Sequence, residues 1–171
     1  MDITIIKPQA TNKTDGIKIG NPQAPHLLLE FLNLRCPYCR QWYQKANPLL
    51  TEAVAAGQLY RVIKLLDKDK ESLQRGNVMH QFVPKDDPEA TLAAIEKIFA
   101  TQDTWGTLSL EEVAEFAQNQ LGLAPAQDLH TSAAIQKEAA SARIQFVPTL
   151  ILDDHIFDES IEIAELSTYL D

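Results

Sequence analysis

The chain has 171 residues, of which 45% are hydrophobic and 23% charged, and its net charge is −9. This composition predicts one folded domain with its own core, and the negative charge argues against nucleic acid or an anionic membrane as a partner. No segment approaches the ~18 apolar residues of a membrane span.

The N-terminal residues Met1–Pro8 have neither the basic start nor the apolar run of a signal peptide. If Met1 is the native start, we expect a cytoplasmic protein, in which a lone cysteine pair is more often catalytic than structural. If the native chain begins further upstream, we expect an extracytoplasmic protein instead.

The first part of the chain predicts the strands of an α/β sheet and one long helix. Short strands are expected at Ile3–Ile6 and at Ile17–Ile19. Residues 26–34 have apolar side chains on both faces, which is typical of a central strand. A helix over about 37–56 follows, and Leu59–Leu66 is the next strand.

Glu30 interrupts the apolar pattern of the central strand. It shares a face with Leu28 and Leu32, and a carboxylate among leucines is costly unless it is paired or protonated. The alternative is that this end of the strand is solvated and that Glu30 reaches water, since glutamate is rarely fully buried without a partner.

Both cysteines of the chain lie in Cys36-Pro37-Tyr38-Cys39, between the central strand and the long helix. Proline favours the first helical position, so we expect Cys36 at the N-cap, where backbone amides and the helix dipole stabilise its thiolate. Such settings lower a thiol pKa from about 8.5 to roughly 3.5–7.5. Cys39 falls on the apolar face of the helix, so we expect it to be buried and to react second.

Arg35 and Arg40 flank the cysteine motif. If their guanidinium groups lie close to the sulfur, they favour the thiolate further, and a stabilised thiolate makes a disulfide more oxidising. We therefore expect an oxidising protein, although the absence of an export signal favours a reducing one.

Three other interpretations of the cysteine pair compete with a redox centre. A zinc site needs about four ligands, whereas there are no further cysteines and the four histidines are scattered: His26, His80, His130 and His155. We therefore expect no metal. A structural disulfide that closes so small a loop would restrain the unfolded chain little. Two inert core cysteines would leave Pro37 and the strand-to-helix junction unexplained.

From Lys70 to about Arg143 the chain is helical in character. Four helices are expected: about 70–83, from Pro88, from the capping box of Ser109 and Glu112, and between Pro125 and Arg143. Strands return at 149–152 and 155–157, and a last helix with Ser160 as its N-cap ends the chain. This order indicates an α/β domain with a helical lid.

The order of elements resembles the DsbA-like branch of the thioredoxin superfamily, in which a helical domain is inserted into the thioredoxin fold. The similarity runs from Asp15 to the C-terminus, and four stretches carry it: Asp15–Pro22, Leu29–Phe31, Cys36–Cys39 and Val147–Thr149. The resemblance implies a single domain over 1–171, with a thioredoxin core at about 15–68 and 144–171 and a helical insertion at about 69–143.

The resemblance also implies residue roles. Pro148 is expected to be the cis-proline that packs opposite the cysteines, and Glu30 the buried acid that manages the proton of Cys39. The substrate groove would be lined by Tyr38, Phe146, Val147 and Pro148. The backbone of Val147 would be free to pair with an extended substrate. Phe146 stands where relatives often have glycine, which changes the expected shape of the groove.

Together, the motif and the resemblance predict a protein thiol–disulfide oxidoreductase. Cys36 and Cys39 would form a redox-active disulfide and exchange it with protein thiols or disulfides through a mixed disulfide. No metal or organic cofactor is required, and a redox recycling partner, not identified by the sequence, is implied.

Two alternatives stay open. A redox-sensing binding module would change its affinity for a partner without turnover. A glutaredoxin-like reductase would share the Cys-Pro-Tyr-Cys motif, but glutaredoxins have a much shorter span between the cysteines and the cis-proline.

Overall fold

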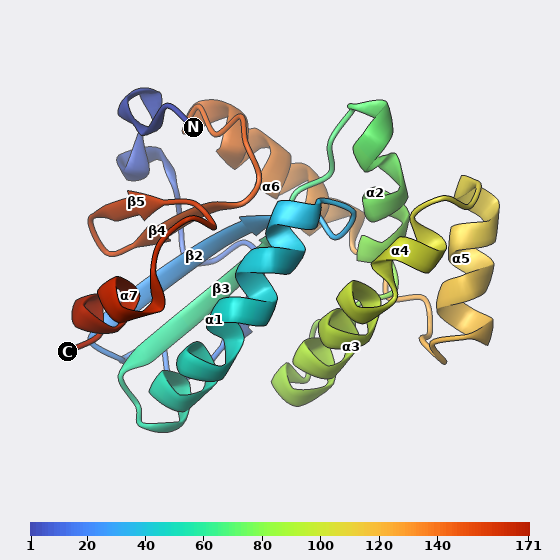
Figure 1. Cartoon of the computed structure of the whole chain (residues 1–171). Coiled ribbons are helices and arrows are strands. Elements are labelled where there is room, and N and C mark those ends of the chain that lie inside the picture. The colour runs from blue at the N-terminus through green and yellow to red at the C-terminus, as the bar shows by residue number, and fades with distance from the viewer.

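The structure is a computed structural model that describes the whole chain, residues 1–171. A five-stranded sheet crosses the molecule (Figure 1). Its strands are β1 (Ile17–Ile19), β2 (His26–Leu32), β3 (Leu59–Leu65), β4 (Thr149–Leu152) and β5 (His155–Phe157). They lie in the order β1-β3-β2-β4-β5, so β2 is central as predicted. β2 and β3 run parallel, whereas the other neighbours are antiparallel.

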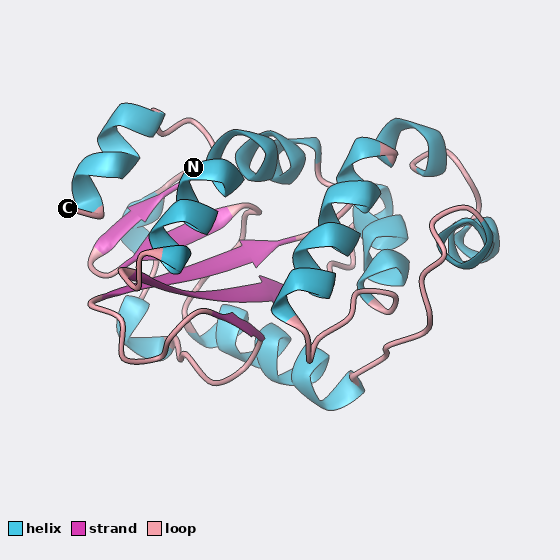
Figure 2. Ribbon diagram, turned by 90° about the horizontal axis from the view of Figure 1, so that it is seen from below, coloured by secondary structure: helices cyan, strands magenta, loops and turns pink.

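Helices cover both faces of the sheet, as Figure 2 shows. They are α1 (Pro37–Ala55), α2 (Gln74–His80), α3 (Pro88–Ala100), α4 (Gln102–Trp105), α5 (Leu110–Asn119), α6 (Leu129–Ser141) and α7 (Ile163–Tyr169). Short 3-10 helices lie at Ile3–Ile5, Pro8–Ala10 and Glu71–Leu73. α2 to α5 form a group beside the sheet, near the N-terminal end of α1 (Figure 1). None of the helices combines the length and apolar character that crossing a membrane requires.

The alternation of side chains along β2 divides the core in two. Leu28 and Leu32 face α1 and belong to a large cluster that extends into the helical group. Leu29 and Phe31 point to the opposite face and belong to a smaller cluster that includes side chains of α6. Two apolar faces are what a central strand of an α/β sheet requires.

The predicted fold class is confirmed. The chain has a thioredoxin fold, and its five helices α2 to α6 lie between β3 and β4 in the sequence, where the helical insertion was expected. The boundaries proposed for that insertion, about 69 and 143, stay a prediction.

Two predictions at the ends of the chain are wrong. Ile3–Ile5 is a 3-10 helix and no strand, and the Asp2 carboxylate caps it by accepting the Thr4 amide at 3.0 Å. The last helix begins with Glu162 as its N-cap and not with Ser160. The Asp158 carboxylate accepts both the amide and the hydroxyl of Ser160, so this residue belongs to a preceding turn.

A buried ion pair ties α6 to the far face of the sheet. Lys64 Nζ of β3 lies 2.8 Å from Glu138 Oε2, and both side chains are almost fully excluded from solvent. Glu138 Oε1 also accepts the backbone amide of Asn12 at 2.8 Å, and Lys64 donates to the Asp15 carbonyl. One carboxylate therefore joins the N-terminal segment, the sheet and α6.

Candidate active site

The two cysteines lie where β2 gives way to α1. Pro37 is the first residue of α1 and Cys36 is its N-cap, as the position of the proline predicts. Both cysteines are free thiols. Cys36 is 5% exposed and Cys39 is fully buried among apolar side chains. The first turn of α1 therefore presents one sulfur at the surface of the core and hides the other.

The Cys36 thiol has the properties of a nucleophile. The Cys39 thiol, by donating a hydrogen bond, lowers the pKa of Cys36 to about 7; the amides of Cys39 and Tyr38 contribute, whereas burial and the Glu159 carboxylate oppose the shift. The protonated Cys36 thiol accepts no capping hydrogen bond, so these amides act on the pKa by favouring the thiolate. The Cys36 Sγ instead donates to the Val147 carbonyl at 3.4 Å.

The Cys39 thiol is held in its protonated form. Burial raises its pKa well above the usual range, and Cys36 adds to the increase. The backbone N–H of Asn33 donates to Cys39 Sγ at 3.4 Å and partly offsets these effects. The directions of the two shifts agree with the predicted assignment of Cys36 as the attacking sulfur and Cys39 as the second.

Arg35 and Arg40 do not act on the sulfur as expected. Arg35 Nε donates to the Gly106 carbonyl at 3.2 Å, and Arg40 pairs with Asp103 at 3.0 Å. Neither guanidinium is among the groups that lower the pKa of Cys36. The two arginines attach the cysteine turn to the region around α4, which removes one argument for an oxidising protein.

The peptide bond between Val147 and Pro148 is cis, as predicted from the resemblance. Pro148 is buried, and the carbonyl of Val147 accepts the Cys36 thiol. The amide of Val147 has no hydrogen-bond partner within the protein. The segment before the proline therefore faces Cys36, and its Val147 amide is unpaired.

A groove of about 790 Å³ opens beside Cys36. Tyr38, Phe146 and Val147 all contribute to its lining, whereas Pro148 does not. Tyr38 and Phe146 are 57% and 52% exposed, respectively, which is unusual for large aromatic side chains. Three of the four residues predicted to line the groove do so, and their part in substrate binding stays a prediction.

Glu30 is buried and paired. Its carboxylate accepts Arg61 Nε at 2.9 Å and Trp42 Nε1 at 3.0 Å, and the side chains of Glu30 and Arg61 are inaccessible to solvent. The alternative in which Glu30 reaches water is therefore wrong. Glu30 lies on the α1 face of the sheet but makes no hydrogen bond to Cys39, and its role in proton transfer stays a prediction.

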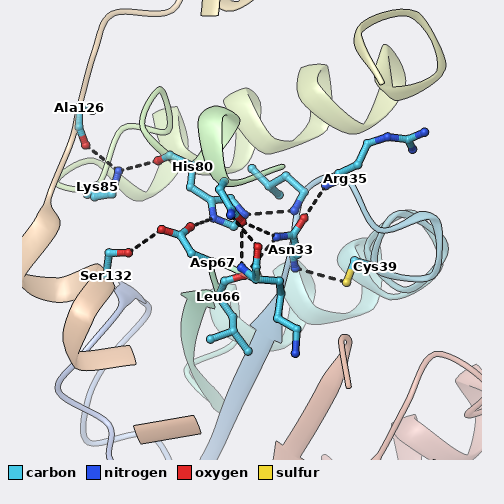
Figure 3. Close-up of polar contacts among 12 residues, drawn as sticks. Asn33, Arg35, Cys39, Leu66, Asp67, His80, Lys85, Ala126 and Ser132 are labelled. Atoms are coloured by element: carbon cyan, nitrogen blue, oxygen red, sulfur yellow. Dashed lines mark hydrogen bonds and ion pairs between the residues drawn. The ribbon is translucent and has the colours of Figure 1, made fainter. Parts of the chain in front are cut away.

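Figure 3 shows a polar network around the cysteine turn that the sequence analysis missed. The Asn33 side chain donates to the Leu66 carbonyl at 3.1 Å and to Asn77 Oδ1 at 3.0 Å. The Leu34 amide donates to His80 Nε2 at 3.1 Å, and His80 Nδ1 lies 2.6 Å from Asp67 Oδ1. No three His, Cys, Asp or Glu side chains gather into a group that could hold a metal ion.

Comparison with known proteins identifies the family. The family model for thioredoxin matches residues 11–171. The chain belongs to the thioredoxin family. None of the curated proteins matches it in sequence.

Several solved structures share the fold. A conserved protein of unknown function from Enterococcus faecalis V583 is 49% identical, with a TM-score of 0.97 over 99% of this chain and 97% of that one. A putative protein-disulfide isomerase from Pseudomonas syringae is 15% identical, with a TM-score of 0.74 over 94% and 100% of the two chains. BdbD from Bacillus subtilis is also 15% identical, with a TM-score of 0.67 over 93% and 92%. These likenesses confirm the predicted fold, and the family model confirms the thioredoxin family.

Proposed function

We propose that the protein is a thiol–disulfide oxidoreductase that acts on protein thiols and disulfides. The observation that carries this proposal is the pairing of two unlike sulfurs: Cys36, with a pKa of about 7 at the start of a helix, and Cys39, buried behind it with a raised pKa. At pH 7 about half of Cys36 is in the reactive thiolate form, whereas Cys39 stays protonated.

The reaction would proceed in two exchanges. The Cys36 thiolate attacks one sulfur of a substrate disulfide, so that this bond breaks, a mixed disulfide forms and the other substrate sulfur leaves as a thiolate that takes up a proton. Cys39 then loses its proton and attacks Cys36 Sγ, which releases the second substrate thiol. The substrate is reduced and the Cys36–Cys39 pair is oxidised; the reverse sequence oxidises a substrate dithiol.

The groove supports an extended polypeptide as the substrate. The unpaired amide of Val147 and its carbonyl, which is freed when the Cys36 thiol ionises, can form hydrogen bonds to a strand that lies across Cys36. Tyr38 and Phe146 offer exposed aromatic surface to such a strand. Phe146 takes the place of the expected glycine without closing the groove.

The pKa of Cys36 guides the proposed redox potential. A thiol pKa near 7 is typical of thioredoxin, whereas that of DsbA is about 3.5. Each unit by which the pKa falls favours the reduced form by about 1.4 kcal/mol, or roughly 30 mV for two electrons. We therefore place the potential nearer to the ~−270 mV of thioredoxin than to the ~−120 mV of DsbA. This proposal replaces the expectation of an oxidising protein, since Arg35 and Arg40 point elsewhere.

One set of assays tests the function. The protein is equilibrated with reduced and oxidised glutathione to measure its potential, and its rates of insulin reduction and of oxidation of a reduced peptide dithiol are then compared with those of a Cys36→Ser variant. We expect turnover in at least one direction that depends on Cys36. Slow reaction in both directions would favour the redox-sensing module instead. We also propose a cytoplasmic location and a redox recycling partner.

A further inference from the structure

The backbone N–H and carbonyl groups of Asn33 and Leu34, in the turn before Cys36, all form hydrogen bonds. The carbonyl of Asn33 accepts the Cys36 amide at 3.0 Å, and the amide of Leu34 donates to His80 Nε2 at 3.1 Å. The two bonds hold opposite edges of one peptide group, that between Asn33 and Leu34. Gln102 Nε2 holds the Leu34 carbonyl at 2.8 Å. The turn is therefore fixed by side chains of α2 and α4.

α2 approaches this turn at a glycine. A β-carbon on Gly76 would lie 1.9 Å from Asn33 Oδ1 and 2.7 Å from the Arg35 amide, so no larger residue fits there without movement of the turn. His80 lies one turn further along α2 and is 6% exposed. The close packing leaves the Leu34 amide no access to water, which makes the His80 nitrogen its only acceptor.

The hydrogen bonds determine the protonation of the imidazole. Because Nε2 accepts the Leu34 N–H, the proton must be on Nδ1, where it is donated to Asp67 Oδ1. The second oxygen of Asp67 accepts the Ser132 hydroxyl of α6 at 2.8 Å. Burial lowers the pKa of His80, whereas Asp67 opposes that shift. A neutral His80 therefore holds the turn, through the contacts drawn in Figure 3.

We propose that His80 is a positioning residue of the redox centre, which, in its neutral form, orients the Asn33–Leu34 peptide and thereby the sulfur-binding N–H of Asn33. This inference rests on the proposed function. When Cys39 ionises to resolve a mixed disulfide, its sulfur gains charge beside that N–H, which lies 3.4 Å away in the reduced protein. His80 thus acts on the resolving step through the turn and touches neither sulfur.

Protonation of His80 would reverse its effect. An imidazolium presents N–H groups on both nitrogens, so Nε2–H would face the Leu34 N–H and the hydrogen bond would be lost. Asp67 and Lys85 are the charged groups that act on His80 directly, and Lys18, Asp86 and Asp128 line the same cavity of about 460 Å³. Burial and Lys85 resist protonation, whereas the Asp67 carboxylate favours it.

Asp67 links the His80 contact to the groove beside Cys36. It is the one residue that lines both the groove at Cys36 and the cavity at His80. Its side chain is 26% exposed, whereas that of His80 is 7% exposed. Changes at Asp67 can therefore reach the cysteine turn through a histidine that solvent barely contacts.

Reaction of the reduced protein with 5,5′-dithiobis(2-nitrobenzoate) separates the two sulfurs. Attack by Cys36 releases one coloured thiolate, and attack by Cys39 on the resulting mixed disulfide releases the second, so the first phase is an internal control. We expect His80→Phe, which removes the acceptor, to slow the second phase by about tenfold at neutral pH and the first phase much less, because a buried amide is left without a partner.

His80→Gln supplies the decisive measurement, because it keeps a neutral acceptor that cannot titrate. We expect its second phase to match that of the unaltered protein at neutral pH. The ratio of the rate of the unaltered protein to that of His80→Gln should drop at a pH below the ordinary histidine pKa of about 6.5, because burial lowers the pKa of His80. Ionisation of Cys39 cancels in this ratio, whereas protonation of His80 does not. Asp67→Asn should shift this drop to lower pH, because the carboxylate favours protonation.

His26 provides the matched control. It also pairs with an aspartate, Asp153, at 2.7 Å, but lies at the far end of β2 from the cysteine turn. His26→Gln should change neither phase. A ratio for His80→Gln that stays constant with pH, or an unchanged second phase in His80→Phe, would overturn the inference alone. If the unaltered protein released no second thiolate, the proposed function would fail and the inference with it.

Discussion

Cys36 and Cys39 are one helical turn apart, nearly equal in exposed surface, and opposite in their chemistry. Cys36 lies at the wall of the groove, where the Cys39 thiol and two backbone amides favour its thiolate. Cys39 is enclosed by the core, and one amide N–H is the only backbone donor that favours its ionisation. The comparison teaches that a small difference in exposed area can accompany a large difference in pKa: burial dominates at Cys39, whereas hydrogen-bond donors outweigh burial at Cys36.

The largest difference between the two sulfurs should appear when each is removed. Cys39→Ser should accumulate a mixed disulfide with its substrate, because Cys36 still attacks and nothing resolves the product. Cys36→Ser should form none, because the remaining sulfur is buried and protonated. Non-reducing electrophoresis after acid quenching measures the adducts. Adducts on Cys36→Ser, or none on Cys39→Ser, would reverse the assignment.

The second test compares the two sulfurs by pH. Alkylation of Cys36 by iodoacetamide should rise with pH through a midpoint near 7, since the thiolate is the reactive form and the pKa of Cys36 is about 7. Cys39 should stay unreactive well into the alkaline range, because its pKa is raised. Mass spectrometry of the labelled peptides follows each site. In denaturant both midpoints should return to about 8.5, and a Cys36 midpoint at that value in the folded protein would contradict the proposed environment.

The smallest expected effect concerns Glu30, which the resemblance assigns to the proton of Cys39. Glu30→Gln should slow resolution of the mixed disulfide and change the Cys36 midpoint less. It also leaves Arg61 buried without its partner, which should lower the free energy of unfolding by about 3–5 kcal/mol.

A second variant separates the two consequences of changing Glu30. The double variant Glu30→Gln/Arg61→Gln removes both charges and should recover stability without recovering the rate. If the double variant resolves the mixed disulfide as fast as the unaltered protein, Glu30 serves the fold and plays no part in proton transfer.

Much of the fold follows from local patterns. The central strand, α1, the capping box at Ser109 and the strands around Asp153 were predictable, because apolar periodicity and capping residues act over a few positions. The predictions failed where a neighbouring side chain competed for the same backbone. Asp158 draws Ser160 into a turn and so moves the start of α7 to Ile163.

The candidate site was only half predictable, for a physical reason. The spacing of Cys36 and Cys39 predicts a redox pair, and the family resemblance predicts the cis bond between Val147 and Pro148. His80 and Asp67 are far from them in the sequence and become neighbours only because α2 packs on the turn at Gly76. The side chains of Arg35 and Arg40 likewise bind partners that no local pattern specifies. These partners are Gly106 and Asp103, in and next to α4.

The buried ion pair between Lys64 and Glu138 shows that one helix of the insertion is part of the core around the sheet. Although α6 belongs to the inserted stretch of sequence, its apolar side chains Ile135 and Ala139 cover the sheet face that carries Phe31 and Val62. Glu138 secures that cover to Lys64 at the sheet's interior. Helices α2 to α5 extend the large core cluster on the α1 side, whereas α6 covers the opposite face of the sheet. A chain shortened by the entire insertion would therefore lose one side of its own interior, and the sequence boundary of the insertion is not a thermodynamic boundary.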